Sequence, residues 1–134
     1  MTPLPGGCYC GAIRYTITLD DPDSQARTSI CHCGNCKRFT GGNYGITTKI
    51  PRSAFELERG KECIKVHEAD NGSGVVLHRE FCGTCGGGLL EFGVSMGWLF
   101  YNVICWEVWG MGLRMRGWTE GMKILMSGED ECDD

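Results

Sequence analysis

The 134-residue sequence lacks any uninterrupted apolar segment long enough to cross a membrane. The longest apolar stretch, residues 94–109, contains Asn102 and Glu107 and is shorter than the roughly 20 apolar residues that a spanning helix needs. The first ten residues, MTPLPGGCYC, lack a basic segment followed by an apolar one, so we expect no secretory signal. The sequence therefore favours neither a membrane protein nor a secreted one.

The sequence also has little net charge outside residues 129–134. These six positions hold five of the 17 acidic residues, which leaves 12 acidic residues against 13 basic ones in the rest of the chain. A nearly neutral surface lacks the basic patch that neutralises phosphate groups. We therefore expect no nucleic-acid partner.

Glycine is abundant, and it argues against a mainly helical protein. There are 21 glycines, and each glycine inside a helix costs about 1 kcal/mol relative to alanine. Several short segments instead alternate apolar and polar residues, which is the period-two pattern of half-buried strands. Turn-forming residues separate them, as in DDPDSQ at 20–25 and NGSG at 71–74. The sequence therefore predicts a mainly β domain, with strands at 13–19, 44–50, 55–59, 62–69, 75–81 and 86–92.

Cysteine is also abundant, and most of the ten cysteines are closely spaced. Cys8 and Cys10 form a C-x-C pair, whereas Cys82 and Cys85 form a C-x-x-C pair followed by glycine. Without an export signal, such pairs favour metal binding over disulfides. Each pair can direct two sulfurs to one ion, so together they predict a closed four-thiolate zinc site that joins distant strands. Zinc binding of this kind contributes about 10 kcal/mol to folding.

A separate triplet, CHCGNC, contains Cys31, Cys33 and Cys36. Three thiolates leave one tetrahedral position open, which is the ligand pattern of a catalytic zinc ion. The alternative is a closed structural site, whose fourth ligand would be one of four other residues: His32, His67, His78 or Cys63.

Three blocks of sequence then stand out together: GGCYCGAIRY at 6–15, CHCGNCKRFTGG at 31–42 and FCGTCGGGL at 81–89. In order and separation they resemble the glutathione-dependent formaldehyde-activating enzyme family, also called the CENP-V/GFA domain. The resemblance covers roughly residues 6–93. It implies a β-tent of small antiparallel sheets organised around two zinc ions. The implied structural zinc ligands are Cys8, Cys10, Cys82 and Cys85, and the implied catalytic ligands are Cys31, Cys33 and Cys36.

The resemblance also implies an activity, namely a carbon–sulfur lyase that adds glutathione to formaldehyde or a related carbonyl and reverses the addition. Lys37 and Arg38 follow the triplet and could bind a glutathione carboxylate, or could lie on a solvated face. His32 could carry a proton or point away from the metal. The alternative function is a zinc-stabilised protein-binding module or an inactive, truncated family member. We expect a cytoplasmic or nuclear metalloprotein whose partner is a small thiol or carbonyl substrate.

The chain changes character near residue 93, so we divide it into a CENP-V/GFA-type zinc domain, 1–93, and a divergent C-terminal segment with an acidic tail, 94–134. All four tryptophans and five of the six methionines lie after residue 95. The closing segment that the resemblance leads us to expect, with a Gly-x-Leu-Asp-Asp-Pro turn, is absent. Residues 94–134 are either a C-terminus that packs on the same domain or the product of a retained intron or a shifted reading frame.

Overall fold

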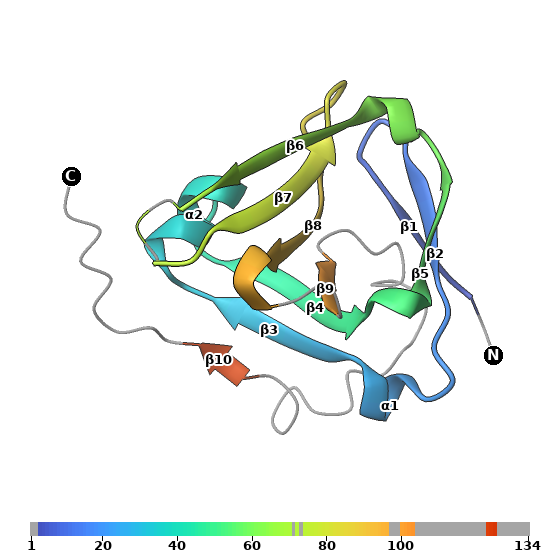
Figure 1. Cartoon of the computed structure of the whole chain (residues 1–134), viewed down its shortest axis with the longest axis horizontal. Helices are drawn as coiled ribbons and strands as arrows, with labels where there is room; N and C mark the ends of the chain where they lie inside the picture. Colours follow the sequence, from blue (N-terminus) through green and yellow to red (C-terminus); the bar gives the residue numbers. More distant parts are fainter. Residues whose placement is uncertain (1–2, 71, 73, 97–99, 104–122, 126–134) are drawn as a thin grey trace.

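The computed structural model describes residues 3–70, 72, 74–96, 100–103 and 123–125. These residues form short strands, two short α-helices and 3-10 turns (Figure 1). In chain order the elements are β1 (Leu4–Gly7), β2 (Arg14–Ile17), α1 (Pro22–Gln25), β3 (Arg27–Cys31), α2 (Gly34–Thr40), β4 (Gly45–Pro51), η1 (Arg52–Ala54), β5 (Phe55–Arg59), η2 (Lys61–Cys63), β6 (Ile64–Ala69), β7 (Leu77–Cys82), β8 (Gly88–Gly93), η3 (Val94–Met96), β9 (Phe100–Val103) and β10 (Lys123–Leu125).

The strands form two sheets. The smaller sheet has the order β1-β2-β5 and is antiparallel. The larger sheet has the order β10-β3-β4-β9-β8-β7-β6, and every neighbouring pair in it is antiparallel except β10, which runs parallel to β3. Figure 1 shows the smaller sheet standing beside one end of the larger one. The prediction of a mainly β fold with small antiparallel sheets is confirmed.

Period-two alternation correctly located most strands. In β2, for example, Tyr15 and Ile17 are buried, whereas Arg14 and Thr16 are partly exposed. Each of the six predicted strands overlaps one observed strand: β2, β4, β5, β6, β7 and β8. The turn or loop predicted at 20–25 contains the helical turn α1, in which Pro22 lies at the first position and the backbone N–H of Gln25 bonds to the carbonyl of Asp21. The predicted turn at 71–74 lies partly outside the described residues.

Strand β9 comes from the sequence beyond residue 93 and lies inside the larger sheet. It pairs with β4 on one side and with β8 on the other. Its Val103 is 1% exposed and stands opposite Thr48 and Leu90 in the two neighbouring strands. The domain boundary at residue 93 and the origin of the following segment stay predictions, and most of that segment, 104–122 and 126–134, lies outside the described residues.

The core lies between the two sheets. Its fully buried side chains come from both of them: Ile13, Tyr15, Ile17, Ile50, Cys82, Leu89, Leu90 and Val103. Phe55 connects the sheets, because its ring lies 4.7 Å from that of Tyr15 and 5.5 Å from that of Tyr101. Neither described α-helix is long and apolar enough to span a membrane.

Candidate metal centres

Four cysteines from the two sheets meet at one end of the fold, and we call them the four-cysteine cluster: Cys8, Cys10, Cys82 and Cys85. The first two follow β1 of the smaller sheet, and the other two lie at the end of β7 and in the turn before β8 of the larger sheet. Their sulfurs all lie within 4.8 Å of one another. The predicted grouping of the two distant pairs is therefore present in the structure.

The sulfur spacing of this cluster suits a tetrahedral metal ion. The sulfurs of Cys8 and Cys10 are 3.6 Å apart, and those of Cys10 and Cys82 are 3.9 Å apart. Four thiolates about 2.3 Å from a zinc ion would be separated by about 3.8 Å. The observed distances fit the edges of that tetrahedron.

Backbone N–H groups point at the sulfurs of the same cluster. Among these hydrogen bonds are Ile13 N–H to Cys8 Sγ at 3.3 Å, Thr84 N–H to Cys82 Sγ at 3.3 Å and Gly87 N–H to Cys85 Sγ at 3.4 Å. Such donors stabilise a thiolate more than a thiol. The backbone N–H groups of Cys10 and Gly87 accordingly lower the pKa of Cys85 to about 6. The tight turns at both pairs therefore favour the metal-binding form of these cysteines.

Crowding acts in the opposite direction on Cys10. The backbone N–H of Ala12 lowers its pKa, but burial and the neighbouring sulfurs outweigh that bond and raise the pKa to about 11. Several thiolates in so small a volume repel one another, and a divalent cation removes that cost. The donor set therefore fits a metal ion, and zinc is consistent with four sulfur ligands.

The remaining grouped cysteines, Cys31, Cys33 and Cys36, form the three-cysteine cluster, whose sulfurs also lie within 4.8 Å of one another. Cys31 ends β3, Cys33 is the N-cap of α2, and Cys36 lies in the first turn of that helix. The Cys33 sulfur accepts a hydrogen bond from the Cys36 N–H at 3.3 Å. The helix start therefore orients two sulfurs, and the end of the strand supplies the third.

No fourth residue completes this cluster in the described part of the chain. A histidine, cysteine or carboxylate within the same distance of all three sulfurs is not found among the described residues. Cys63 and the three histidines, proposed above as alternative fourth ligands, do not join it there. Burial raises the pKa of Cys31 and of Cys36, and neighbouring sulfurs add to the shift at Cys36. A metal ion would offset this cost, and its coordination would be incomplete with these three ligands alone.

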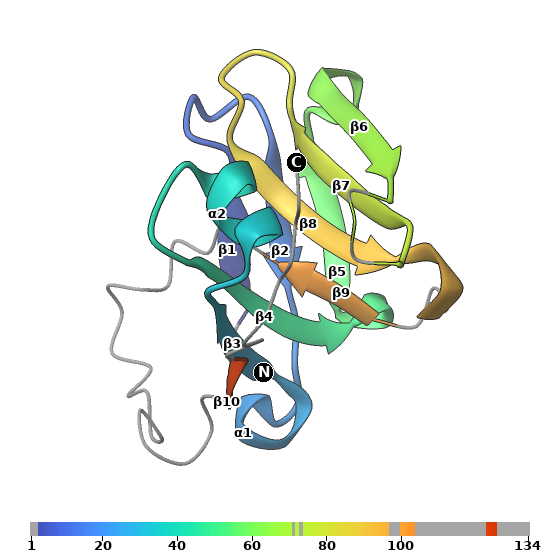
Figure 2. The same ribbon diagram turned by 90° about the vertical axis from the view of Figure 1, so that its left-hand side faces the viewer.

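Gly45, the first residue of β4, lies against the three-cysteine cluster. Figure 2 shows α2, which carries two of these cysteines, beside the start of β4. A Cβ atom at this position would lie 3.1 Å from Cys36 Cβ and 3.5 Å from its sulfur. A side chain here would require Cys36 to shift by a few tenths of an ångström, so glycine favours this close approach. The backbone of β4 therefore forms one wall of the cluster.

A buried arginine on β7 holds α2 against the larger sheet. The Arg79 guanidinium carbon lies 4.3 Å from the centre of the Phe39 ring, three residues beyond Cys36 in α2. Its Nε donates a hydrogen bond to Glu91 on β8 at 2.7 Å. Sequence analysis missed this contact, because an arginine in an alternating strand does not reveal which element it packs against.

The polar residues predicted beside the three-cysteine cluster are exposed. Lys37 and Arg38 both lie on the surface of α2, where Arg38 donates a hydrogen bond to Asn35 at 3.2 Å. His32 is exposed, and its ring lies 5.7 Å from that of Tyr44. The roles predicted for Lys37, Arg38 and His32 stay predictions.

The comparisons with known proteins cover the part of the chain that contains both clusters. A family model described as "Glutathione-dependent formaldehyde-activating enzyme" matches residues 3–97, which include every cysteine of both clusters. The chain belongs to this family. The family resemblance expected from the three sequence blocks is therefore confirmed.

Two individual matches add detail to the family membership. A Halomonas elongata protein that carries the provisional name of a glutathione-dependent formaldehyde-activating enzyme is 30% identical over 91 residues, which are 66% of this chain and 55% of that protein. The chain thus spans about half the length of this relative. The crystal structure of a Rhodobacter sphaeroides protein superimposes with a TM-score of 0.56 and 24% identity over 75% of this chain and 84% of that one. This second match supports the fold alone.

Proposed function

We propose that the chain is a zinc-dependent carbon–sulfur lyase that adds glutathione, or another thiol, to formaldehyde or a related carbonyl and reverses the addition. The observation that supports this most directly is the contrast between the clusters. Four sulfurs at one site complete a tetrahedron, whereas three half-buried sulfurs at the other leave a position for a substrate. Family membership supplies the names of the two substrates.

In this proposal each residue of the three-cysteine cluster is a ligand of the catalytic zinc ion. That ion would supply a Lewis acid that favours the thiolate form of a bound thiol. In the addition the thiol sulfur bonds to the carbonyl carbon, and the thiol proton ends on the carbonyl oxygen. The exposed His32 lies between Cys31 and Cys33 in the sequence and would carry that proton. Lys37 and Arg38 would bind the carboxylates of glutathione and set its orientation.

The four-cysteine cluster has a structural role in the same proposal. It joins the end of β1 to the end of β7, and so holds the smaller sheet against the larger one. A second zinc ion there would contribute to folding rather than to turnover. The eight described cysteines form no disulfide, which suits a reducing compartment, and we place the protein in the cytoplasm or nucleus.

The test replaces one cysteine at a time and measures zinc content together with turnover. Cys33→Ser removes a ligand of the three-cysteine cluster, and Cys63→Ser removes a half-buried cysteine that belongs to neither cluster. Native mass spectrometry counts zinc, and exchange NMR with ¹³C-formaldehyde and glutathione measures the rate of adduct formation. We expect two zinc ions and accelerated exchange for the unmodified chain and for Cys63→Ser, and one zinc ion without acceleration for Cys33→Ser.

Two outcomes would contradict the proposal. Acceleration that persists in Cys33→Ser would show that the three-cysteine cluster is not the catalytic site. An unmodified chain that binds two zinc ions without accelerating exchange would favour the alternative function, a zinc-stabilised binding module or an inactive family member.

A further inference from the structure

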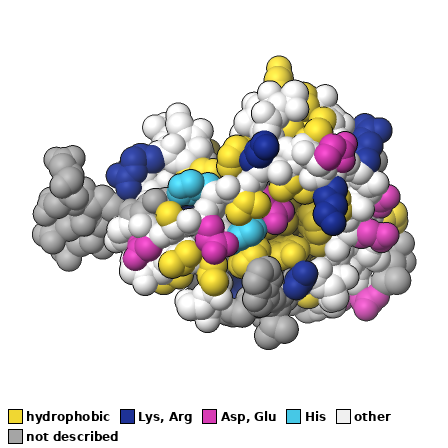
Figure 3. Space-filling view, turned by 45° about the horizontal axis from the view of Figure 1, so that its top comes forward, with side chains coloured by type: hydrophobic (Ala, Val, Ile, Leu, Met, Phe, Trp, Pro, Cys, Tyr) yellow, Lys and Arg dark blue, Asp and Glu magenta, His cyan; other side chains and the backbone are white. Residues whose placement is uncertain are grey.

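A hollow in the molecule lies away from both cysteine clusters. It has a volume of about 480 Å³ and lies where β5, η1 and η2 face strands β6 to β9. Figure 3 shows a face of the molecule on which hydrophobic side chains are exposed among acidic, basic and histidine side chains. Its size is within the range of small-molecule pockets, which is roughly 300–1,000 Å³.

The apolar part of this hollow is formed by rings that pack on one another. Phe55 and Tyr101 line it together with Leu90. The Tyr101 ring contacts Phe55 edge-on at 5.5 Å and stacks on Phe92 at 5.5 Å. Leu90 is almost fully buried. An apolar ligand body would therefore meet preformed aromatic and aliphatic walls.

Two cations line the same hollow. The guanidinium of Arg52 lies 5.7 Å from the centre of the Tyr101 ring, and Lys61 is an exposed residue of η2. Lys61 forms no ion pair with any other residue that the structure describes. These two side chains would bind a negatively charged group of a ligand.

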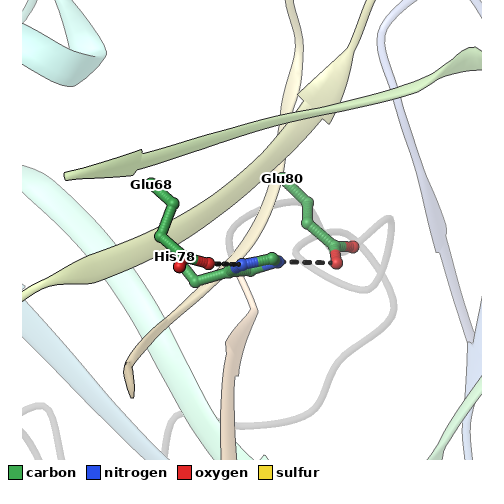
Figure 4. Close-up of polar contacts among 3 residues, drawn as sticks. All are labelled: Glu68, His78 and Glu80. Carbon is green, nitrogen blue, oxygen red and sulfur yellow. Dashed lines mark hydrogen bonds and ion pairs between the residues drawn. The ribbon is translucent and has the colours of Figure 1, made fainter. Parts of the chain in front are cut away.

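One carboxylate also lines the hollow, but a neighbouring histidine already holds it. Glu80 accepts a hydrogen bond from His78 Nε2 at 3.0 Å, and the other ring nitrogen lies 2.7 Å from Glu68 (Figure 4). The His78 ring is fixed in turn by stacking on Phe92 at 4.5 Å. The hollow is therefore lined by two cations, Arg52 and Lys61, and by one carboxylate, Glu80, so its lining has a net positive charge.

The hollow is too far from the three-cysteine cluster to belong to it. Gly45, at one end of β4, touches Cys36, whereas Ile50, near the other end, pairs with Tyr101. Five residues of strand separate these positions by about 16 Å. The side chains of β7 also divide between the two, because Arg79 faces α2 and Glu80 faces the hollow.

We propose that this hollow is a second small-molecule site, distinct from the proposed catalytic site. It binds a carboxylate attached to an apolar body about the size of a phenyl ring. The carboxylate pairs with Lys61 and Arg52, and the apolar body packs on Phe55, Leu90 and Tyr101. The site goes beyond the proposed lyase activity and does not depend on it.

The test uses two probes of the same size and apolar body, the anionic 3-phenylpropionate and the neutral 3-phenylpropanamide, added to the zinc-loaded chain. Backbone amide NMR shifts locate the probe, and calorimetry measures its affinity. We expect the carboxylate to shift residues around Tyr101 and not those of α2, and to bind about tenfold more tightly than the amide, the worth of one charge-assisted hydrogen bond. Lys61→Gln should remove most of that preference. Lys65→Gln, an exposed lysine of β6 that does not line the hollow, should leave it unchanged.

Three results would overturn the proposal. Equal affinity for the two probes would exclude carboxylate recognition. Shifts confined to α2 would place the probe at the three-cysteine cluster instead. If Lys61→Gln and Lys65→Gln lower the affinity for the carboxylate equally, the overall charge of the protein would explain the effect, and not this hollow.

Discussion

Replacing Arg79 with methionine tests how the larger sheet supports α2. Arg79 is 5% exposed, and its carboxylate partner, Glu91, is 15% exposed. The same guanidinium lies over the Phe39 ring of α2. The substitution therefore removes an ion pair and a cation–π contact at once, while methionine fills much of the vacated volume.

The expected loss of stability follows from the burial of this pair. Removing one partner of a buried ion pair costs about 3–5 kcal/mol, because the remaining charge loses its compensation. The cation–π contact adds about 0.5–2 kcal/mol. We expect Arg79→Met to lower the free energy of unfolding by at least about 3 kcal/mol. In the double variant Arg79→Met/Glu91→Leu most of the loss should disappear, because apolar replacement of a whole buried pair is often neutral.

Urea unfolding, followed by circular dichroism at fixed free zinc concentration, measures these differences. Arg59→Met is the matched control, because Arg59 is exposed and its guanidinium bonds only to the carbonyl of Gly11 among the contacts described. We expect this control to cost less than about 1 kcal/mol. A loss below about 1 kcal/mol for Arg79→Met, or a double variant as unstable as the single one, would refute the reasoning.

The same substitution should affect the two clusters unequally. Phe39 lies one helical turn after Cys36, so a loosened α2 would disturb the three-cysteine cluster first. We expect Arg79→Met to release one zinc ion to a competing chelator more readily than the unmodified chain does, while the other stays bound. Equal release of both ions would show that Arg79 supports the sheet in general and not α2 in particular.

The remaining predictions concern a histidine and a glycine. Burial lowers the pKa of His78, but its hydrogen bonds with Glu68 and Glu80 outweigh that effect and raise the pKa above the usual value. The stabilisation from its charged form is therefore complete below about pH 6.5 and is lost as the pH rises through the raised pKa. Urea unfolding between pH 6 and 8 should show a steeper fall in stability for the unmodified chain than for His78→Asn, and identical slopes would contradict the assignment. Gly60→Ala should destabilise by more than about 2 kcal/mol, because Gly60 has a φ of 88° and a Cβ there would lie 2.3 Å from the Ala12 carbonyl oxygen. Gly74→Ala, with a φ of 79° and no atom within 4 Å of a Cβ, should cost only about 1 kcal/mol, and equal losses in thermal unfolding would refute the steric argument.

Much of the fold was predictable because alternation along a strand is a local property. The segment 55–59 illustrates this, since the predicted bounds are those of β5. The grouping of Cys8 and Cys10 with Cys82 and Cys85 was also predictable, because metal-ligand spacing imposes a distance between residues far apart in the sequence.

Other elements depend on partners that no local pattern reveals. Strand β1, with the sequence LPGG, has no alternation of its own and is a strand because β2 pairs with it. Helix α2 spans only seven residues of a glycine-flanked cysteine motif, and its N-cap is a cysteine rather than a serine, threonine, aspartate or asparagine. The central position of β9 depends on its pairing with β4 and β8. This pairing was not predicted, because the change in composition after residue 93 indicated a separate segment.

Strand β7 contributes residues to three parts of the molecule. Its end residue, Cys82, belongs to the four-cysteine cluster, while Glu80 lines the hollow. Arg79 points the other way and holds α2, which carries the three-cysteine cluster. Because β7 pairs with β6 and β8 on its two edges, it cannot shift without breaking both ladders. A structural metal ion that fixes Cys82 against β1 would therefore also hold β7 in place. Because Arg79 of β7 contacts α2, that ion would support the proposed catalytic cluster as well.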